Sequence, residues 1–280
     1  MFKALGGPDA PAATEIPINE GRASLRLQRP PSTPAKAPAI FHIHAGGGVS
    51  GTAAMCDGLN WRRALDHGAV VASLEYRLAP ETNFPGPLED AYAGLVWIAA
   101  QAESLDIDPA RIVLLGESAG GGLAATLALL ARDHGGPAIA AQVLAYPMLD
   151  YLTGGPDDPR EHGHGGAYFW PAGSNHFGWN AQRGETAIGP DQLGYFSALH
   201  AQSYANLPPT FIAVGGLDLL FDEALDFARR LTHAGNPVDL QVYASAFHNF
   251  DVVRPAAVTQ RFLADLSAAL DRGLAARGVA

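Results

Sequence analysis

The sequence predicts an α/β fold in which helices cover both faces of a mostly parallel sheet. Short apolar segments alternate with longer, helix-like segments from residue 40 to the end of the chain. The apolar segments are continuous rather than alternating with polar residues, which is typical of parallel strands buried on both faces. Because ligands bind beyond the carboxyl ends of such strands, functional residues are expected directly after them.

Eight segments are expected to be strands. The first two, residues 14–19 and 23–28, lie in an N-terminal region rich in proline and alanine, and prolines 30–38 then predict an exposed loop. The fifth, residues 111–116, contains the fully apolar run Ile-Val-Leu-Leu. The remaining expected strands are residues 40–44, 70–77, 138–146, 210–215 and 238–244.

Four segments are expected to be helices: residues 85–102, 119–132, 219–234 and 255–277. In the first, third and fourth, apolar residues recur at the spacing of one helix face. The longest such row is Val258, Phe262, Leu266, Leu270 and Leu274. Two glycines and a proline at 135–137 would end the second helix, and Pro255 suits the first turn of the last.

The composition excludes several classes of protein. With 48% hydrophobic and 16% charged residues, the chain can bury a core, and we expect one domain over residues 1–280. A net charge of -10 disfavours nucleic-acid binding. The single cysteine, Cys56, allows no internal disulfide. Neither a secretion signal nor a stretch of about 20 apolar residues is visible, so a cytoplasmic location is expected.

Residues 150–206 interrupt the alternation, with no convincing periodicity and many glycines, prolines, histidines and aromatics. Such a connection is usually a functional lid or a disordered insertion, and the aromatics favour a lid. The aromatics 168–170 and Trp179 either line a pocket or anchor the lid, and we favour anchoring. Three histidines leave a metal site open, but without acidic or cysteine ligands at suitable spacing we expect none. They are His162, His164 and His176.

The segment Gly116-Glu117-Ser118-Ala119-Gly120 stands between the apolar strand and a helix. A G-x-S-x-G sequence in this position predicts a nucleophile elbow, in which a sharp turn holds the serine oxygen at the top of the sheet. The positive end of the helix dipole lies beside it. The alternative is a helix start whose small residues merely allow close packing. In its context we interpret Ser118 as the nucleophile.

A second loop of interest is His44-Ala45-Gly46-Gly47-Gly48, at the end of the strand 40–44. Consecutive glycines expose backbone N–H groups, which stabilise an oxyanion that develops during acyl transfer. Alone, the loop could equally be a flexible turn. Combined with the elbow, it predicts an oxyanion hole formed by the amides of Gly46, Gly47 and Ala119.

A serine hydroxyl needs a base, and of the ten histidines only His248 follows the last strand. The acid that orients the base is expected between serine and histidine in chain order. Asp218 follows the strand 210–215 and is our choice, because a rigid strand end can hold it in place. Its rivals are Asp222, Glu223 and Asp251.

Taken together, these motifs resemble the hormone-sensitive-lipase-like carboxylesterases of the α/β-hydrolase superfamily. The resemblance covers about residues 38–255 and rests on His44–Gly47, Tyr76–Glu81, Gly116–Gly121, Leu207–Pro209, Asp218–Glu223 and His248–Phe250. It implies the α/β-hydrolase fold and a serine esterase that acts on small-molecule esters of short to medium acyl chains without a cofactor. It also implies a homodimer paired through the last strand.

The chain departs from that family at several positions. Ala45 replaces a glycine, which is tolerable if its φ is negative, and Glu117 replaces an aspartate or threonine, which leaves its hydrogen bonds open. Phe221 and Asn249 replace a common arginine and glycine. Residues 1–38 would form only a reduced cap, so an open pocket covered mainly by residues 150–206 is expected. An acetylesterase, an amidase or a non-catalytic ligand-binding homologue remain alternatives.

Overall fold

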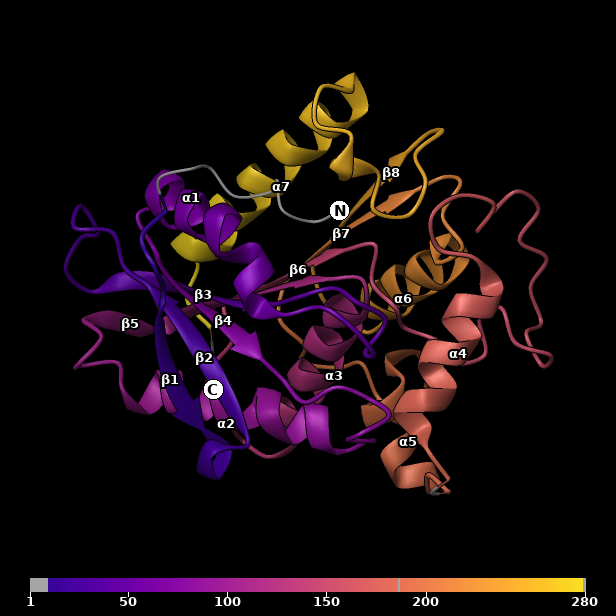
Figure 1. Ribbon diagram of the computed structural model, residues 1–280, viewed down its shortest axis with the longest axis horizontal. Helices are drawn as coiled ribbons and strands as arrows, with labels where there is room; N and C mark the ends of the chain where they lie inside the picture. The colour runs from indigo at the N-terminus through magenta and orange to yellow at the C-terminus, as the bar shows by residue number, and fades with distance from the viewer. Residues whose placement is uncertain (1–9, 186, 279–280) are drawn as a thin grey trace.

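The computed structural model describes residues 10–185 and 187–278 (Figure 1). In this part of the chain, one sheet of eight strands has the order β1-β2-β4-β3-β5-β6-β7-β8. The strands are β1 (Thr14–Ile18), β2 (Ala23–Gln28), β3 (Ala37–Ile43), β4 (Val70–Glu75), β5 (Ile107–Glu117), β6 (Ala141–Ala145), β7 (Thr210–Gly215) and β8 (Val238–Tyr243). All eight expected strands are therefore confirmed.

The sheet is mostly parallel, as expected. The pairs β1–β2 and β2–β4 are antiparallel. The other five pairs are parallel and join six strands in the order β4, β3, β5, β6, β7, β8. The carboxyl ends of these six strands consequently meet at one edge. The loops that follow them form the surface on which the candidate site lies.

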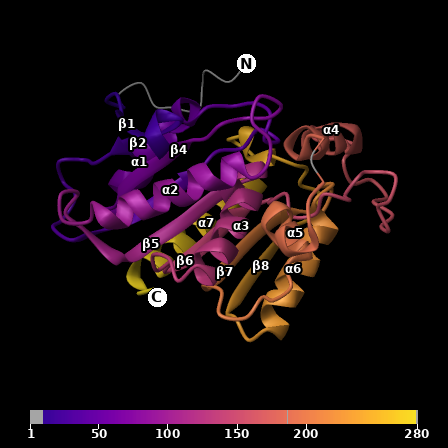
Figure 2. The same cartoon turned by 90° about the horizontal axis from the view of Figure 1, so that it is seen from below.

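The helices are α1 (Asp57–His67), α2 (Gly86–Ala100), α3 (Ala119–Asp133), α4 (Ala172–Arg183), α5 (Pro190–Phe196), α6 (Phe221–His233) and α7 (Ala257–Ala275). Figure 2 shows α2, α3 and α6 on the near side of the sheet and α7 behind it. Side chains alternate along β5 between the two cores: Leu114 packs in the core beside α3, and Val113 and Leu115 pack in the core beneath α7. None of the described helices has the length and hydropathy needed to span a bilayer.

Four details differ from the sequence-based expectations. Helix α1 was not predicted, because its sequence is mostly polar and buries only Asn60 and Ala64. Helices α4 and α5 lie within residues 150–206, where no regular element was expected; α4 contains two glycines and shows no apolar row. Pro38, assigned to the loop, lies in β3, where the pairing with β5 shifts register between Ala37 and Ala39. Such an irregularity accommodates a residue that lacks an N–H.

Candidate active site

Ser118 is the single residue between β5 and α3, and its backbone has φ 55° and ψ -119°. This strained backbone is what a nucleophile elbow requires. The flanking glycines are sterically required. A Cβ on Gly116 would lie 2.3 Å from the Gly120 carbonyl oxygen, and one on Gly120 would lie 2.2 Å from the Ile43 carbonyl oxygen. The geometric expectation from the G-x-S-x-G sequence is therefore met.

The structure brings Ser118, His248 and Asp218 into one hydrogen-bonded series. Ser118 Oγ lies 2.9 Å from His248 Nε2, and His248 Nδ1 lies 2.9 Å from Asp218 Oδ2. All three are buried, with 4%, 3% and 2% of their surface exposed, respectively. The amide of Leu220 donates to Asp218 Oδ1 at 2.9 Å and fixes the carboxylate. An Nδ1–H donated to this carboxylate leaves Nε2 as an acceptor facing the serine hydroxyl.

The rival carboxylates are occupied elsewhere. Asp251 accepts a hydrogen bond from the Tyr146 hydroxyl at 2.9 Å, and burial raises the pKa of its carboxyl. Glu223 is fully buried beneath residues 149–160, and Asp222 is 40% exposed. Within the described residues, Asp218 is the only one of the four carboxylates that bonds His248.

The glycine loop takes a conformation that only glycine adopts readily. Gly46 has φ 138° and Gly47 has φ 65°, whereas Ala45 is not among the residues with positive φ. The condition on which Ala45 could replace a glycine is therefore satisfied. A Cβ on Gly46 would lie 1.8 Å from the Ser50 carbonyl oxygen, a distance that excludes any side chain there.

The amides of Gly46, Gly47 and Ala119 are free to act as donors. Within the described residues, none of them donates any of the hydrogen bonds found. Gly46 and Gly47 line a cavity of about 390 Å³ together with Ser118 and His248. Ala119 lines a smaller cavity of about 40 Å³ beside it. Gly46 and Gly47 therefore share a cavity with Ser118, Ala119 follows Ser118 in the chain, and the joint action of the three amides as an oxyanion hole stays a prediction.

We expect Gly46→Ala to reduce kcat for ester hydrolysis by about 10²–10³, the cost of losing one oxyanion donor. The new Cβ would displace the loop from the Ser50 carbonyl. Steady-state kinetics would measure the effect. Gly135→Ala is the matched control, because Gly135 also has positive φ but a Cβ there meets nothing within 4 Å. Equal losses in both variants would contradict the assignment.

Glu117, whose hydrogen bonds the sequence left open, binds two residues behind the elbow. Arg63 Nη2 donates to it at 2.6 Å, and His42 Nε2 lies 3.3 Å from its other oxygen. Burial alone would raise the pKa of Glu117, but the Arg63 charge and the His42 hydrogen bond outweigh burial and lower that pKa. The sequence did not identify Arg63, because α1 was not predicted.

Within the described residues, one group of potential metal ligands comes together: His42, Cys56 and Glu117. The neighbouring Arg63 cation already pairs with Glu117, and burial raises the pKa of Cys56 to about 12. Both features disfavour a metal ion. The histidines of the insertion do not form such a group in this part of the chain; His162 pairs with Asp158 instead.

We expect Arg63→Met to lower the free energy of unfolding by about 3–5 kcal/mol, because it leaves a buried carboxylate without its partner. The pKa of Glu117 is lower in the folded protein than its unfolded value of about 4.3. This difference stabilises the wild-type fold above the unfolded pKa, and the stability is lost as the pH falls toward the folded-state pKa. Without Arg63, burial should raise the Glu117 pKa, so urea denaturation should show a larger loss of stability relative to the wild type at pH 7 than at pH 4. Arg62→Met is the control, since Arg62 pairs with Asp66 at the surface, and its loss should lower the free energy of unfolding by less than about 1 kcal/mol. Similar losses for both would contradict the expectation.

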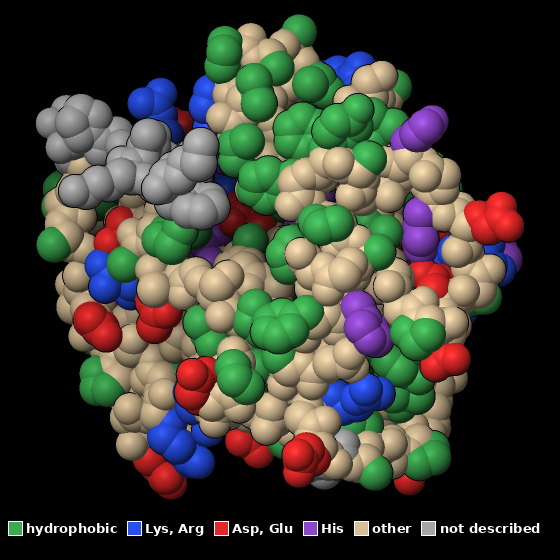
Figure 3. Space-filling model, turned by 45° about the vertical axis from the view of Figure 1, so that its right-hand side comes forward, with side chains coloured by type: hydrophobic (Ala, Val, Ile, Leu, Met, Phe, Trp, Pro, Cys, Tyr) green, Lys and Arg blue, Asp and Glu red, His purple; other side chains and the backbone are tan. Residues whose placement is uncertain are grey.

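Aromatic residues of the insertion face the two cavities. Phe169 and Trp170 line the larger one, and the Trp170 ring lies 5.9 Å from the His248 ring. Phe169 and Trp170 therefore line a pocket, the alternative that was left open, and the anchoring role that we favoured stays a prediction. Trp179 lines the smaller cavity and packs edge-on against Phe196, with ring centroids 5.1 Å apart. Large hydrophobic side chains remain exposed on the molecule, including Phe169. Figure 3 shows hydrophobic side chains gathered in the upper half of one face.

Comparisons with known proteins identify the family and fold of the chain. A family model described as alpha/beta hydrolase fold matches residues 40–252, more than half of the chain. The chain is 34% identical over 257 residues to the esterase LipI of Mycobacterium tuberculosis, covering 88% of this chain and 73% of LipI. It is 34% identical over 248 residues to an ethyl acetate hydrolase of Pseudomonas putida, covering 87% and 76%. Half of the chain matches 19% of the hormone-sensitive lipase of Bos taurus at 34% identity.

Among solved structures, a bacterial heroin esterase superposes with a TM-score of 0.86 at 37% sequence identity. The superposition covers 98% of this chain and 87% of that one. The likeness therefore extends over the whole sheet, its flanking helices and the insertion.

Proposed function

The chain belongs to the α/β-hydrolase fold family, among the ester hydrolases that are similar to hormone-sensitive lipase, and we propose that it is a serine carboxylesterase acting on short- to medium-chain acyl esters. The observation that carries the proposal is the series of hydrogen bonds from Ser118 through His248 to Asp218. These residues, in that order, are a nucleophile, a base and an orienting acid. The esterase names of the relatives support the same reaction class.

In the proposed mechanism, His248 Nε2 takes the hydroxyl proton as Ser118 Oγ attacks the ester carbonyl carbon. The carbonyl oxygen becomes an oxyanion, which accepts hydrogen bonds from the amides of Gly46, Gly47 and Ala119. His248 then gives its proton to the departing alcohol oxygen. In the second half, His248 takes a proton from water, the water oxygen attacks the acyl-enzyme, and Ser118 regains its proton.

The proposed substrate range rests on the size of the site. The cavity that contains Ser118 has a volume of about 390 Å³, and Phe169 and Trp170 form part of its wall. We propose that residues 150–206, which supply this wall, act as a lid. A relative that covers most of the chain is named for hydrolysis of ethyl acetate, which is a short ester.

We expect p-nitrophenyl esters to be hydrolysed with the highest kcat/KM between acetate and hexanoate. A panel from acetate to decanoate would measure this, and an optimum at decanoate would contradict the proposed range. Labelling by a fluorophosphonate tests the nucleophile separately, because only an activated serine reacts. Labelling that is absent would favour a non-catalytic ligand-binding protein.

The proposal includes a homodimer formed through β8. This strand is at the edge of the sheet, has β7 as its neighbour, and exposes 43% of Val242. An exposed edge strand can pair with a second copy of itself. Light scattering that gives a monomer mass at micromolar concentration would refute this part of the proposal.

A further inference from the structure

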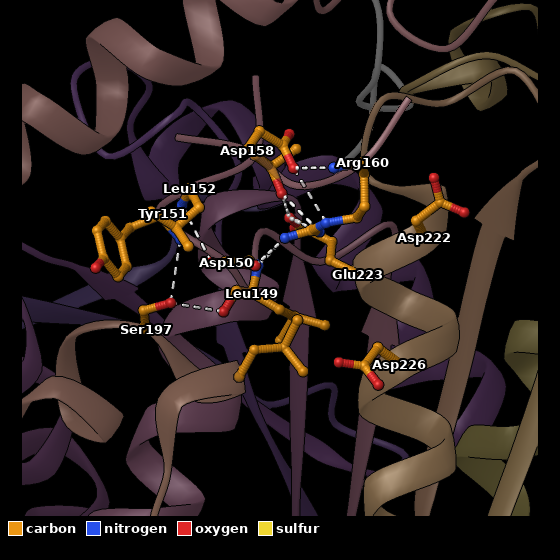
Figure 4. Close-up of polar contacts among 12 residues, drawn as sticks. Leu149, Asp150, Tyr151, Leu152, Asp158, Arg160, Ser197, Asp222, Glu223 and Asp226 are labelled. Carbon is orange, nitrogen blue, oxygen red and sulfur yellow. Dashed lines mark hydrogen bonds and ion pairs between the residues drawn. The ribbon is translucent and has the colours of Figure 1, made fainter. Parts of the chain in front are cut away.

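A buried cluster of charged residues joins the insertion to α6 (Figure 4). At its centre, the Arg160 guanidinium bonds Asp150, lies 3.2 Å from Asp158 and lies 3.9 Å from Glu223. Asp150, Asp158 and Arg160 belong to the insertion, whereas Glu223 is on α6. One arginine therefore holds together carboxylates from two separate parts of the chain.

Arg160 compensates part of the negative charge of Asp150 and Asp158, together with the hydrogen bonds that His200 and His162 form with them. Burial raises the pKa of Glu223 well above its usual value, which favours its protonated form. Burial would also raise the pKa of Asp150, but the His200 hydrogen bond and the Arg160 charge help to lower it. Removing the arginine would leave at least two carboxylates close together in a buried site, and such a site is expected to rearrange.

A continuous series of hydrogen bonds leads from this cluster to the cavity wall. Arg160 Nη1 donates to the Thr153 hydroxyl at 3.0 Å, and Asn175 Nδ2 donates to the Thr153 carbonyl oxygen at 2.8 Å. The Trp170 indole N–H then donates to Asn175 Oδ1 at 2.9 Å. Thr153 and Asn175 are fully buried, so the bond between them is shielded from water.

Trp170 lies against the residues that the proposed chemistry uses. A Cβ placed on Gly47 would be 2.6 Å from the Trp170 ring, so the ring rests directly on the oxyanion loop. Its centroid is 5.9 Å from that of the His248 ring. A further hydrogen bond ties the insertion to the loop that carries Asp218: the Gly166 amide donates to the carbonyl oxygen of Leu217, the residue before Asp218, at 3.3 Å. The position of this indole therefore determines how much room is left beside the nucleophile.

We propose that Arg160 is a positioning residue for ester hydrolysis: acting through Thr153 and Asn175, it holds Trp170 against the oxyanion loop and thereby limits the size of ester that the cavity admits. The inference rests on the proposed esterase function. Arg160 itself does not line the cavity. Its effect is on specificity, through the wall of the substrate site.

The test compares Trp170→Ala, Arg160→Met and the double variant on two ester panels, one with increasing acyl length and one of acetates with increasing alcohol size. Trp170→Ala should raise the relative kcat/KM of the larger esters by about 10-fold, the usual value of one or two methylene groups in a pocket. Arg160→Met should change it in the same direction. The double variant should match Trp170→Ala, since residues that act through one another are not additive.

Three further variants complete the design. Arg160→Lys keeps the positive charge, so its selectivity should lie between those of Arg160→Met and the wild type. If Arg160→Met does not fold, Arg160→Lys is compared with Trp170→Ala in its place. Asn175→Leu breaks the series at its middle and should resemble Trp170→Ala. Arg111→Met is the control, because Arg111 pairs with the largely buried Asp108 near the opposite end of β5 and should leave selectivity unchanged.

The outcomes separate this inference from the proposed function. Additive effects in the double variant, or unchanged selectivity in a folded Arg160→Met, would overturn the inference. Acrylamide quenching of tryptophan fluorescence, with Trp170→Phe to identify the Trp170 contribution, should show greater access to this indole in Arg160→Met. Unchanged access would also overturn the inference. This readout does not need turnover, whereas absent ester turnover and absent fluorophosphonate labelling in the wild type would refute the esterase proposal itself.

Discussion

Ser118→Ala is expected to reduce kcat/KM for p-nitrophenyl butyrate by a factor of about 10⁴ or more. The substitution removes the oxygen that would attack the ester, and the hydroxyl that bonds His248 Nε2 at 2.9 Å. The other elements of the site are retained, so a residual rate over water should persist from the oxyanion amides and substrate binding. Because Ser118 is buried at the top of the sheet and loses a single atom, the fold should survive.

The comparison needs evidence that the variant is folded. Thermal denaturation and far-UV circular dichroism should match those of the wild type. Ser104→Ala is a suitable control, since the Ser104 hydroxyl is exposed and bonds the nearby Gln101. Turnover near the wild-type level in a folded Ser118→Ala would show that Ser118 is not the nucleophile.

Asp218→Asn is expected to lower kcat by about 10⁴, although the two side chains have nearly the same shape. An amide can donate a hydrogen bond to His248 Nδ1, which favours the tautomer with its proton on Nε2. That tautomer cannot accept the hydroxyl proton of Ser118. The Leu220 amide that now holds the carboxylate at 2.9 Å should keep the new side chain in place.

Asp251→Asn is the matched control for this prediction. Asp251 lines the same cavity and was a rival for the orienting acid, but its carboxylate bonds Tyr146 instead of His248. Its substitution should change kcat far less than that of Asp218. A larger loss in Asp251→Asn would reverse the assignment and give the orienting role to Asp251.

Features that depend on neighbouring residues were predictable from the sequence. All eight strands were expected from the sequence, most of them from short apolar segments, and the spacing of small residues around Ser118 predicted the strand-to-helix turn that the structure contains. The reason is that a strand end, a tight turn and a glycine at a close approach each follow from a few consecutive side chains. The parallel order of the strands then brought Ser118, Asp218 and His248 to one edge.

Helices without an apolar row were not predictable in the same way. α1 and α4 are held by buried polar residues, such as Asn60 in α1 and Asn175 in α4, rather than by a hydrophobic stripe. Such residues are stabilised by partners elsewhere in the fold: Asn175 bonds the Thr153 carbonyl oxygen, 22 positions earlier in the chain. Their helices therefore depend on tertiary contacts more than on local propensity.

The sequence by itself determined the fold class, the strand ends and the residue types that stand there, because these follow from local periodicity and from the steric needs of glycine and serine at the elbow. Only the tertiary structure decided which buried polar and charged groups pair. Arg63 meets Glu117 across 54 positions, and Thr153 meets Glu223 across 70. Many arginines and carboxylates could satisfy one another, and burial in a low-dielectric interior selects the few pairs that the packed chain can bring within hydrogen-bonding distance.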